Sequence, residues 1–227
     1  MMLDFSKTFE KYEALVAQVD KIFAAMQEAH KDCVRCKIYC CDCCYAVFDV
    51  TLIESAYINH HFNKLLDRKE RRKILRRAER ADRKFYQIKR KLQKMYVKEE
   101  KSPEEVLSHL ARERVPCPLL NDEKLCDLYA SRPITCRVYG IPTSIGGTPH
   151  ICGESGFKEG TAYPTVNLDN MNNRLIELSK DLLQEIGANH PRMHMSLVPV
   201  SAALMTTYDR KYFGIQRRRR PDAQTIA

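Results

Sequence analysis

Cysteine is the residue type in this chain whose number and spacing could do chemistry. Ten cysteines occur among 227 residues, and six of them fall between Cys33 and Cys44. Thiols at this density either form disulfides or act as ligands of a soft metal. The other four lie in a stretch rich in proline and glycine. The ten are Cys33, Cys36, Cys40, Cys41, Cys43, Cys44, Cys117, Cys126, Cys136 and Cys152.

The rest of the sequence favours metal ligands over disulfides. The first residues include an acid at Asp4 and lack the apolar segment of a secretory signal. No stretch approaches the roughly 20 apolar residues of a membrane span. We therefore expect a cytoplasmic protein, in a compartment that keeps thiols reduced. Adjacent pairs such as Cys43-Cys44 also suit a disulfide framework poorly. Disulfides and buried free thiols are the alternatives.

Glycine and proline, the strongest breakers of regular structure, divide the chain. Neither occurs before Ser102, whereas Pro116 to Pro164 holds six of each. The helical first part should contain the first cysteine cluster, and the irregular part should complete the metal site. The predicted regions are a helical region at 1–114, a second cysteine region at 115–165, a C-terminal helix in 166–190, and an extension at 191–227 whose basic tail, Arg217–Arg220, we expect to be disordered.

Two long helices carry matching apolar seams. A first helix that begins near Asp4 or Ser6 and a third helix over 64–98 both place apolar residues at a 4-3-4-3 spacing. The simplest arrangement is an antiparallel pair that buries the two seams against each other. The sequence thus predicts a mainly α fold, an antiparallel helical bundle with a cysteine-rich subdomain built from loops and a hairpin. The seams are Phe5, Phe9, Tyr12, Val16, Val19, Phe23 and Met26, and Ile74, Ala78, Ala81, Phe85, Ile88, Leu92 and Met95.

Capping patterns mark three further helices. Thr51 to Glu54 reads as a capping box that starts a second helix, although Glu54 could instead be a ligand. Ser102 to Glu105, with proline at the first helical position, starts a fourth helix. A last helix begins near Asn167 or Asp169 and stops at Gly187.

One straight helix cannot gather the first cysteines around one metal. Cys33 to Cys44 would span roughly 16 Å as a helix, whereas the sulfurs of a tetrahedral site lie within about 4 Å of each other. Either the helix breaks near Tyr39, or the run serves more than one metal. Further on, a small hairpin that turns at Asn121-Asp122 should bring Cys117 beside Cys126.

The charge of the chain is concentrated in one block. The net charge is +9, and residues 64–98 hold sixteen lysines and arginines against four acids. Such a block can attract nucleic acid, an acidic protein or an anionic membrane. The alternative is an ordinary solvated helix face.

The cysteine pattern as a whole resembles a known family. Cys36-x3-Cys40-x2-Cys43-Cys44 precedes Cys117-Pro-Leu-Leu and Cys126-x2-Tyr-x2-Arg-Pro-x2-Cys136-Arg, and Cys152 follows. This resembles the YkgJ-type cysteine-cluster family of zinc- or iron-chelating proteins, over about 33–55 and 115–153. The first cluster departs from the family spacing by one residue, so the ligands among the first six cysteines stay open. The resemblance implies the ligand set Cys36, Cys40, Cys43, Cys44, Cys117, Cys126, Cys136 and Cys152, with Cys33 and Cys41 as extra cysteines.

The resemblance implies a thiolate site for zinc or iron, with an iron–sulfur cluster as one form. Arg132 and Arg137 could offset thiolate charge and donate hydrogen bonds to sulfur, and Tyr129 could shield the site from water. Arg35 could offset charge in the same way, Tyr139 could shield the site as Tyr129 could or belong to the core, and His150, two residues before Cys152, is a spare ligand.

Three functions remain open from the sequence. The first is a cysteine-cluster metal-binding protein. The second is an enzyme related to flagellin lysine methylases, which contain a similar cysteine module. The third is an interaction module in which the basic helix 64–98 binds nucleic acid or an acidic protein and the metal is a scaffold. The sequence alone leaves open whether the protein is an enzyme.

Overall fold

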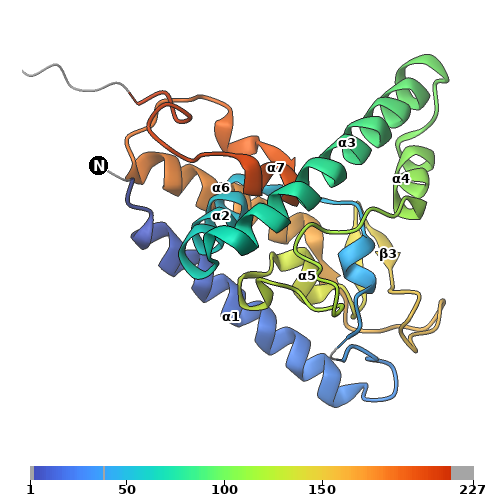
Figure 1. Cartoon of the computed structure of the whole chain (residues 1–227). Coiled ribbons are helices and arrows are strands. Elements are labelled where there is room, and N and C mark those ends of the chain that lie inside the picture. Colours follow the sequence, from blue (N-terminus) through green and yellow to red (C-terminus); the bar gives the residue numbers. More distant parts are fainter. Residues whose placement is uncertain (1–2, 38, 216–227) are drawn as a thin grey trace, which may run out of the picture.

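The computed structural model describes residues 3–37 and 39–215 (Figure 1). Across these residues the chain is mainly helical, as the sequence predicts. One long helix lies along one side of the molecule, and a second long helix crosses the body and extends beyond it. The α-helices of the described part are α1 (Ser6–Ala29), α2 (Leu52–Leu65), α3 (Arg68–Lys98), α4 (Pro103–Arg112), α5 (Ile134–Val138), α6 (Leu168–Glu185) and α7 (Val200–Met205).

Short strands and 3₁₀ turns connect the helices. β1 pairs antiparallel with β5, and a second sheet has the order β3-β2-β4, with β2 and β4 parallel. The irregular region predicted at 115–165 thus contains a hairpin, which Gly146 and Gly147 turn with φ values of 56° and 79°. The strands are β1 (Asp49–Thr51), β2 (Thr143–Ile145), β3 (Thr148–His150), β4 (Val166–Asn167) and β5 (Leu197–Pro199), and the 3₁₀ turns are η1 (Asp42–Tyr45), η2 (Tyr129–Ser131) and η3 (Met193–Met195).

The predicted helix starts are confirmed. Thr51 and Glu54 form a capping box at α2, and Ser102 and Glu105 form another at α4. Helix α3 begins at Arg68 rather than at 64, because a further capping box at Asp67 separates it from α2.

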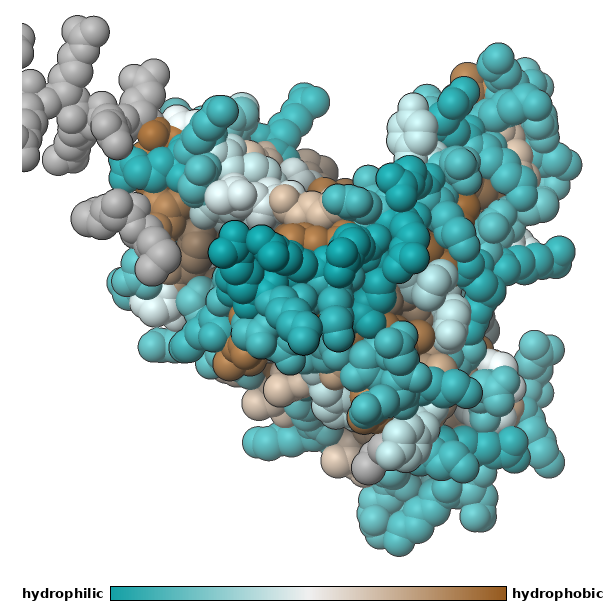
Figure 2. All heavy atoms as spheres, in the orientation of Figure 1, coloured by the Kyte–Doolittle hydropathy of each residue, from teal (hydrophilic) through white to brown (hydrophobic). Residues whose placement is uncertain are grey.

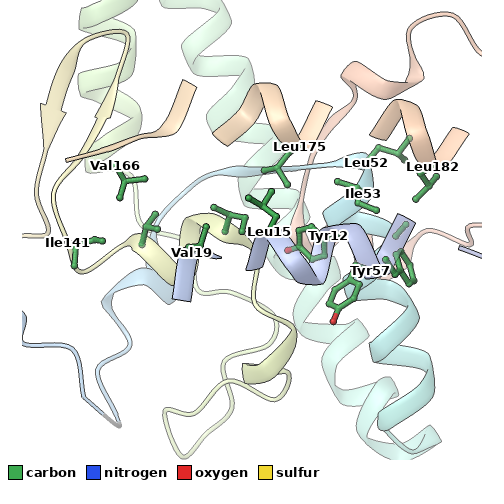
Figure 3. Packing of buried hydrophobic residues seen from close by; sticks show 14 of the residues in the cluster. Tyr12, Leu15, Val19, Leu52, Ile53, Tyr57, Ile141, Val166, Leu175 and Leu182 are labelled. Atoms are coloured by element: carbon green, nitrogen blue, oxygen red, sulfur yellow. The ribbon is translucent and has the colours of Figure 1, made fainter. Parts of the chain in front are cut away.

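The main core forms where α1, α2 and α6 meet (Figure 3). Side chains of α1 point between α2 and α6, and α5 covers the same core from the cysteine-rich part of the chain. Burial of these apolar side chains fixes α1 and α5 relative to each other. The residues that Figure 3 labels in this core are Tyr12, Leu15, Val19, Leu52, Ile53, Tyr57, Ile141, Val166, Leu175 and Leu182.

The predicted pairing of the two long helices is wrong. Helix α1 packs on α6, α5 and α2, whereas α3 packs on α7 and α4. Within the described residues, the buried side chains of α3 share no core cluster with those of α1. Two helices whose apolar seams have the same period need not pack against each other, because any apolar surface of the right shape can cover either seam. Here the short helix α7 covers Ile74 of α3.

The region after α6 belongs to the core rather than to an extension. Val200 and Ala203 of α7 are buried against α3, and Phe213 is fully buried near the start of α1. The predicted basic tail, Arg217–Arg220, lies outside the described residues. No described helix combines the length and the apolar character that crossing a bilayer requires.

Candidate metal centre

Eight of the ten cysteines line one cavity of about 860 Å³. They reach it from four parts of the chain: the segment after α1, the η1 turn, the stretch that includes α5 and the loops before it, and the loop after β3. The cavity thus brings together thiols that are far apart in the sequence. The lining cysteines are Cys36, Cys40, Cys43, Cys44, Cys117, Cys126, Cys136 and Cys152.

The remaining two, Cys33 and Cys41, are not among the residues that line the cavity. Cys33 packs at the edge of the main core, and its carbonyl oxygen accepts a hydrogen bond from Gly156 N at 2.8 Å. The division between lining and outlying cysteines coincides with the ligand set that the family resemblance implies.

The first cysteine run is irregular rather than helical. Helix α1 ends at Ala29, ten residues before the break that we expected near Tyr39. Tyr39 itself has a φ of 71°, in the left-handed region, so the chain also turns there. The η1 turn then presents Cys43 and Cys44 side by side to the cavity.

Backbone hydrogen bonds hold the η1 turn against the second cysteine region. Cys117 N donates to Cys44 O at 2.7 Å, and Val115 N donates to Tyr45 O at 3.0 Å. The predicted hairpin after Cys117 is reduced to a single bridge between Leu120 and Cys126. Even so, Cys117 and Cys126 both reach the cavity.

Helix α5, which carries Cys136, is anchored by a buried carboxylate. Oε1 of Glu54 accepts a hydrogen bond from Ile134 N at 2.9 Å, while Oε2 accepts from both Thr51 N and Thr51 Oγ1. Glu54 therefore caps α2 and α5 together, which accounts for it without a role as a ligand.

Arg137 lines the cavity but directs its hydrogen bonds to oxygen atoms. Its Nη1 donates to the Asp20 carboxylate at 2.8 Å, and its Nε and Nη2 donate to the carbonyl oxygens of Arg132 and Ala130. We expected this side chain to donate to sulfur. In the described part of the chain it instead fixes the 130–137 loop to α1.

Arg132 is the cation whose charge acts on the pKa values of several cavity thiols. Its guanidinium lies 3.6 Å from the centroid of the exposed Tyr129 ring, and both residues line the cavity. Interaction with Cys136 and Cys44 lowers the pKa of Cys43, the positive charge of Arg132 lowers it further, and the same charge opposes the rise in the pKa of Cys36. The role of Arg132 in offsetting thiolate charge stays a prediction.

Three of the thiols influence one another's ionisation. Interaction with Cys136 and Cys44 lowers the pKa of Cys43, and interaction with Cys43 together with burial raises the pKa values of those two thiols. Burial raises the pKa of Cys117 to about 12 and that of Cys36 to about 11. More than one thiolate in this cavity therefore requires a cation to compensate it.

The gathered thiols do not form a closed coordination shell. In the described ranges 3–37 and 39–215, no group of three or more histidine, cysteine or acidic side chains has the geometry to hold a metal ion. The residues are of the type that ligates a soft metal. Their sulfur atoms are grouped less tightly here than the ligands of an occupied thiolate site.

The remaining predicted residues divide between the cavity and the surface. Tyr139 lines the cavity, whereas Arg35 and His150 are exposed and are not among its lining residues. Two further histidines, His60 and His61, have rings 5.2 Å apart that pack against Phe9 and Tyr57 on the main core.

Two acids at the site are not among the residues that the sequence predicts. Asp20 reaches the cavity from α1, next to the apolar seam, and Asp42 accepts a hydrogen bond from the Cys152 thiol at 3.7 Å. Asp42 also pairs with Arg114. The position of Asp42 within the cysteine run was the available signal, while nothing local distinguishes Asp20.

Comparison with known proteins found no matching family model, no similar curated protein and no similar solved structure. The resemblance to the YkgJ-type family therefore stays a prediction that rests on its motif.

Proposed function

We propose that this protein binds zinc or iron through cysteine thiolates, with an iron–sulfur cluster as one form of the bound iron. The observation that carries the proposal is the convergence of eight cysteines on one cavity while Cys33 and Cys41 lie outside it.

The donor set limits the choice of metal. Thiolates are soft ligands that suit zinc, Cu(I) and iron–sulfur clusters and suit magnesium or calcium poorly. Eight thiolates satisfy two four-cysteine sites, or one cluster and one zinc site. Among the lining residues, Arg132 supplies positive charge beside these sulfurs.

Metal binding would also stabilise the fold. The cysteines connect the segment after α1, the η1 turn and the 117–152 region, which loop hydrogen bonds and buried side chains such as Ile134 and Leu119 also hold in place. A ligand that binds only the folded chain adds its binding free energy to the free energy of unfolding. Metal would thus act as a cross-link across the irregular half of the protein.

Anaerobic purification followed by elemental analysis and visible absorption tests the proposal. We expect zinc or iron at one or more equivalents per chain, with a broad visible band if the iron is in a cluster. A strong chelator should lower the midpoint of thermal unfolding. Protein that carries no metal and whose unfolding is insensitive to the chelator would contradict the proposal.

A further inference from the structure

Helix α3 carries a line of exposed arginines on the face opposite its buried seam. Arg72, Arg76, Arg83 and Arg90 are all exposed. At 100° per residue, their directions fall within an arc of about 40°. The buried seam of α3, from Ile74 to Met95, points the other way. The four side chains therefore form one straight arginine stripe on the outer surface.

The arginine stripe lacks the carboxylate partners that neighbouring cations have. Lysines on the flanks of α3 are paired, since Lys89 contacts Asp49 and Lys91 contacts Glu113. Within the described part of the chain, none of the four arginines forms an ion pair, and Arg90 makes only a distant contact over the Tyr86 ring, at 5.9 Å. One exposed acid, Glu79, lies on the same face between Arg76 and Arg83, so the stripe presents four positive charges against one negative charge.

The stripe is long and held rigid. From Arg72 to Arg90 it covers about 27 Å at 1.5 Å per residue. Helix α3 contains no glycine or proline, and it is fixed from behind by α7 near Ile74 and by α4 further along (Figure 1). Figure 2 shows a mainly hydrophilic surface where this helix crosses the body. The positions of the charges are therefore set before any partner binds.

We propose that the arginine stripe of α3 binds the phosphate backbone of a nucleic-acid duplex. A duplex carries phosphates at regular spacing along its two helical strands, with about one negative charge per 1.7 Å of its axis, and arginine matches phosphate with two parallel hydrogen bonds. This interaction is independent of the metal site, since the stripe and the cavity lie on different faces of α3: the α3 residue that lines the cavity, Phe85, belongs to the buried seam.

The residues around the stripe disfavour three other partners: an anionic membrane, an acidic protein and a single-stranded nucleic acid. Binding in a membrane interface requires apolar side chains that enter the lipid, and a protein interface needs apolar or aromatic anchors. Among the described residues from Arg72 to Arg90, Tyr86 is the one exposed large hydrophobic side chain, and Tyr96 and Val97 are exposed beyond the end of the stripe. Single strands bind through stacked aromatic rings, of which only Tyr86 lies beside the stripe.

The test compares two variants of the full chain with equal loss of charge. The first replaces the stripe (Arg72→Gln, Arg76→Gln, Arg83→Gln and Arg90→Gln). The control replaces four exposed lysines on other elements (Lys7→Gln, Lys21→Gln, Lys31→Gln and Lys158→Gln). Glutamine keeps the helix propensity of arginine and lysine, and circular dichroism checks that both variants are folded.

Fluorescence anisotropy with labelled 20-base-pair DNA and RNA duplexes, over about 50 to 200 mM salt, is the measurement. We expect the stripe variant to bind at least about tenfold more weakly than the wild type, and its log–log salt slope to be shallower by about three to four, since each lost phosphate contact removes about 0.9. The control should bind within about twofold of the wild type.

Three results would overturn the proposal. One is absence of duplex binding by the wild-type protein. Another is an equal loss of affinity in both variants, which would assign binding to net charge alone. The third is stronger binding of poly-glutamate or of anionic lipid vesicles than of either duplex, which would assign the stripe to an acidic protein or to a membrane. Weaker binding confined to the stripe variant supports the proposal for the duplex that shows it.

Discussion

The buried guanidinium of Arg137 donates to both carboxylate oxygens of Asp20, at 3.0 and 2.8 Å, and so joins the loop before Cys136 to helix α1. The same guanidinium satisfies the carbonyl oxygens of Arg132 and Ala130. One side chain therefore orients the segment that carries part of the candidate metal centre.

Replacing Arg137 should destabilise the protein strongly. Arg137→Ala leaves two carbonyl oxygens and the Asp20 carboxylate without their donor, and we expect a loss of about 2–4 kcal/mol in the free energy of unfolding. Asp20 is about half exposed, so Asp20→Ala should cost less, about 1 kcal/mol. Urea unfolding measures both.

Lys11→Ala is the matched control for this prediction, because the pair of Lys11 with Asp181 lies at the surface of α1. It should change the stability by less than about 0.5 kcal/mol. A similar loss in Arg137→Ala and Lys11→Ala would show that Arg137 does not anchor the loop.

Gly140 is a second residue that determines where a cysteine side chain can lie. A Cβ atom built on Gly140 would lie 2.0 Å from Sγ of Cys36, so Gly140→Ala must displace that thiol. We expect a loss of about 1–3 kcal/mol from overpacking and a lower metal content by elemental analysis.

Gly153→Ala provides the comparison, because a Cβ there meets no atom within 4 Å and Gly153 lies next to Cys152 in the sequence. Its metal content should equal that of the wild type. If Gly140→Ala also retained the full metal content, Cys36 would not be a ligand.

Glu54 should give the stability a distinct pH dependence. Burial raises its pKa above the ordinary value of 4.5, so the folded state holds this proton at pH values where the unfolded chain has released it. The resulting stabilisation is complete below pH 4.5 and is lost as the pH rises through the raised value. Urea unfolding of wild type and Glu54→Gln from about pH 4 to pH 7 should show this fall only in the wild type. An identical slope in both proteins would exclude Glu54 as its source.

The helix starts could be predicted from the sequence because their signals are local. The capping boxes at Thr51 and Ser102 need only four adjacent residues, and both are present. That Cys36 and Cys136 line the same cavity could be expected only from the resemblance to the YkgJ-type family, because no local sequence pattern shows which distant thiols lie together.

The tertiary arrangement was less predictable for a physical reason. The seams of α1 and α3 have the same period, and burial is not directional, so the pattern alone could not show that α7 covers Ile74. The hairpin of β2 and β3 was also missed, because its strands are three residues long and β3 is exposed throughout. Such strands carry no alternation of apolar and polar residues.

The most direct test of the account measures metal per chain in four cysteine variants purified without oxygen. Cys43→Ser and Cys136→Ser remove thiols that line the cavity, and Cys33→Ser and Cys41→Ser remove the two that do not. The account predicts that each cavity variant loses at least about one equivalent of zinc or iron, while the other two match the wild type. Equal metal content in all four variants, or equal loss from all four, would contradict the proposal that the cavity thiols are the ligands.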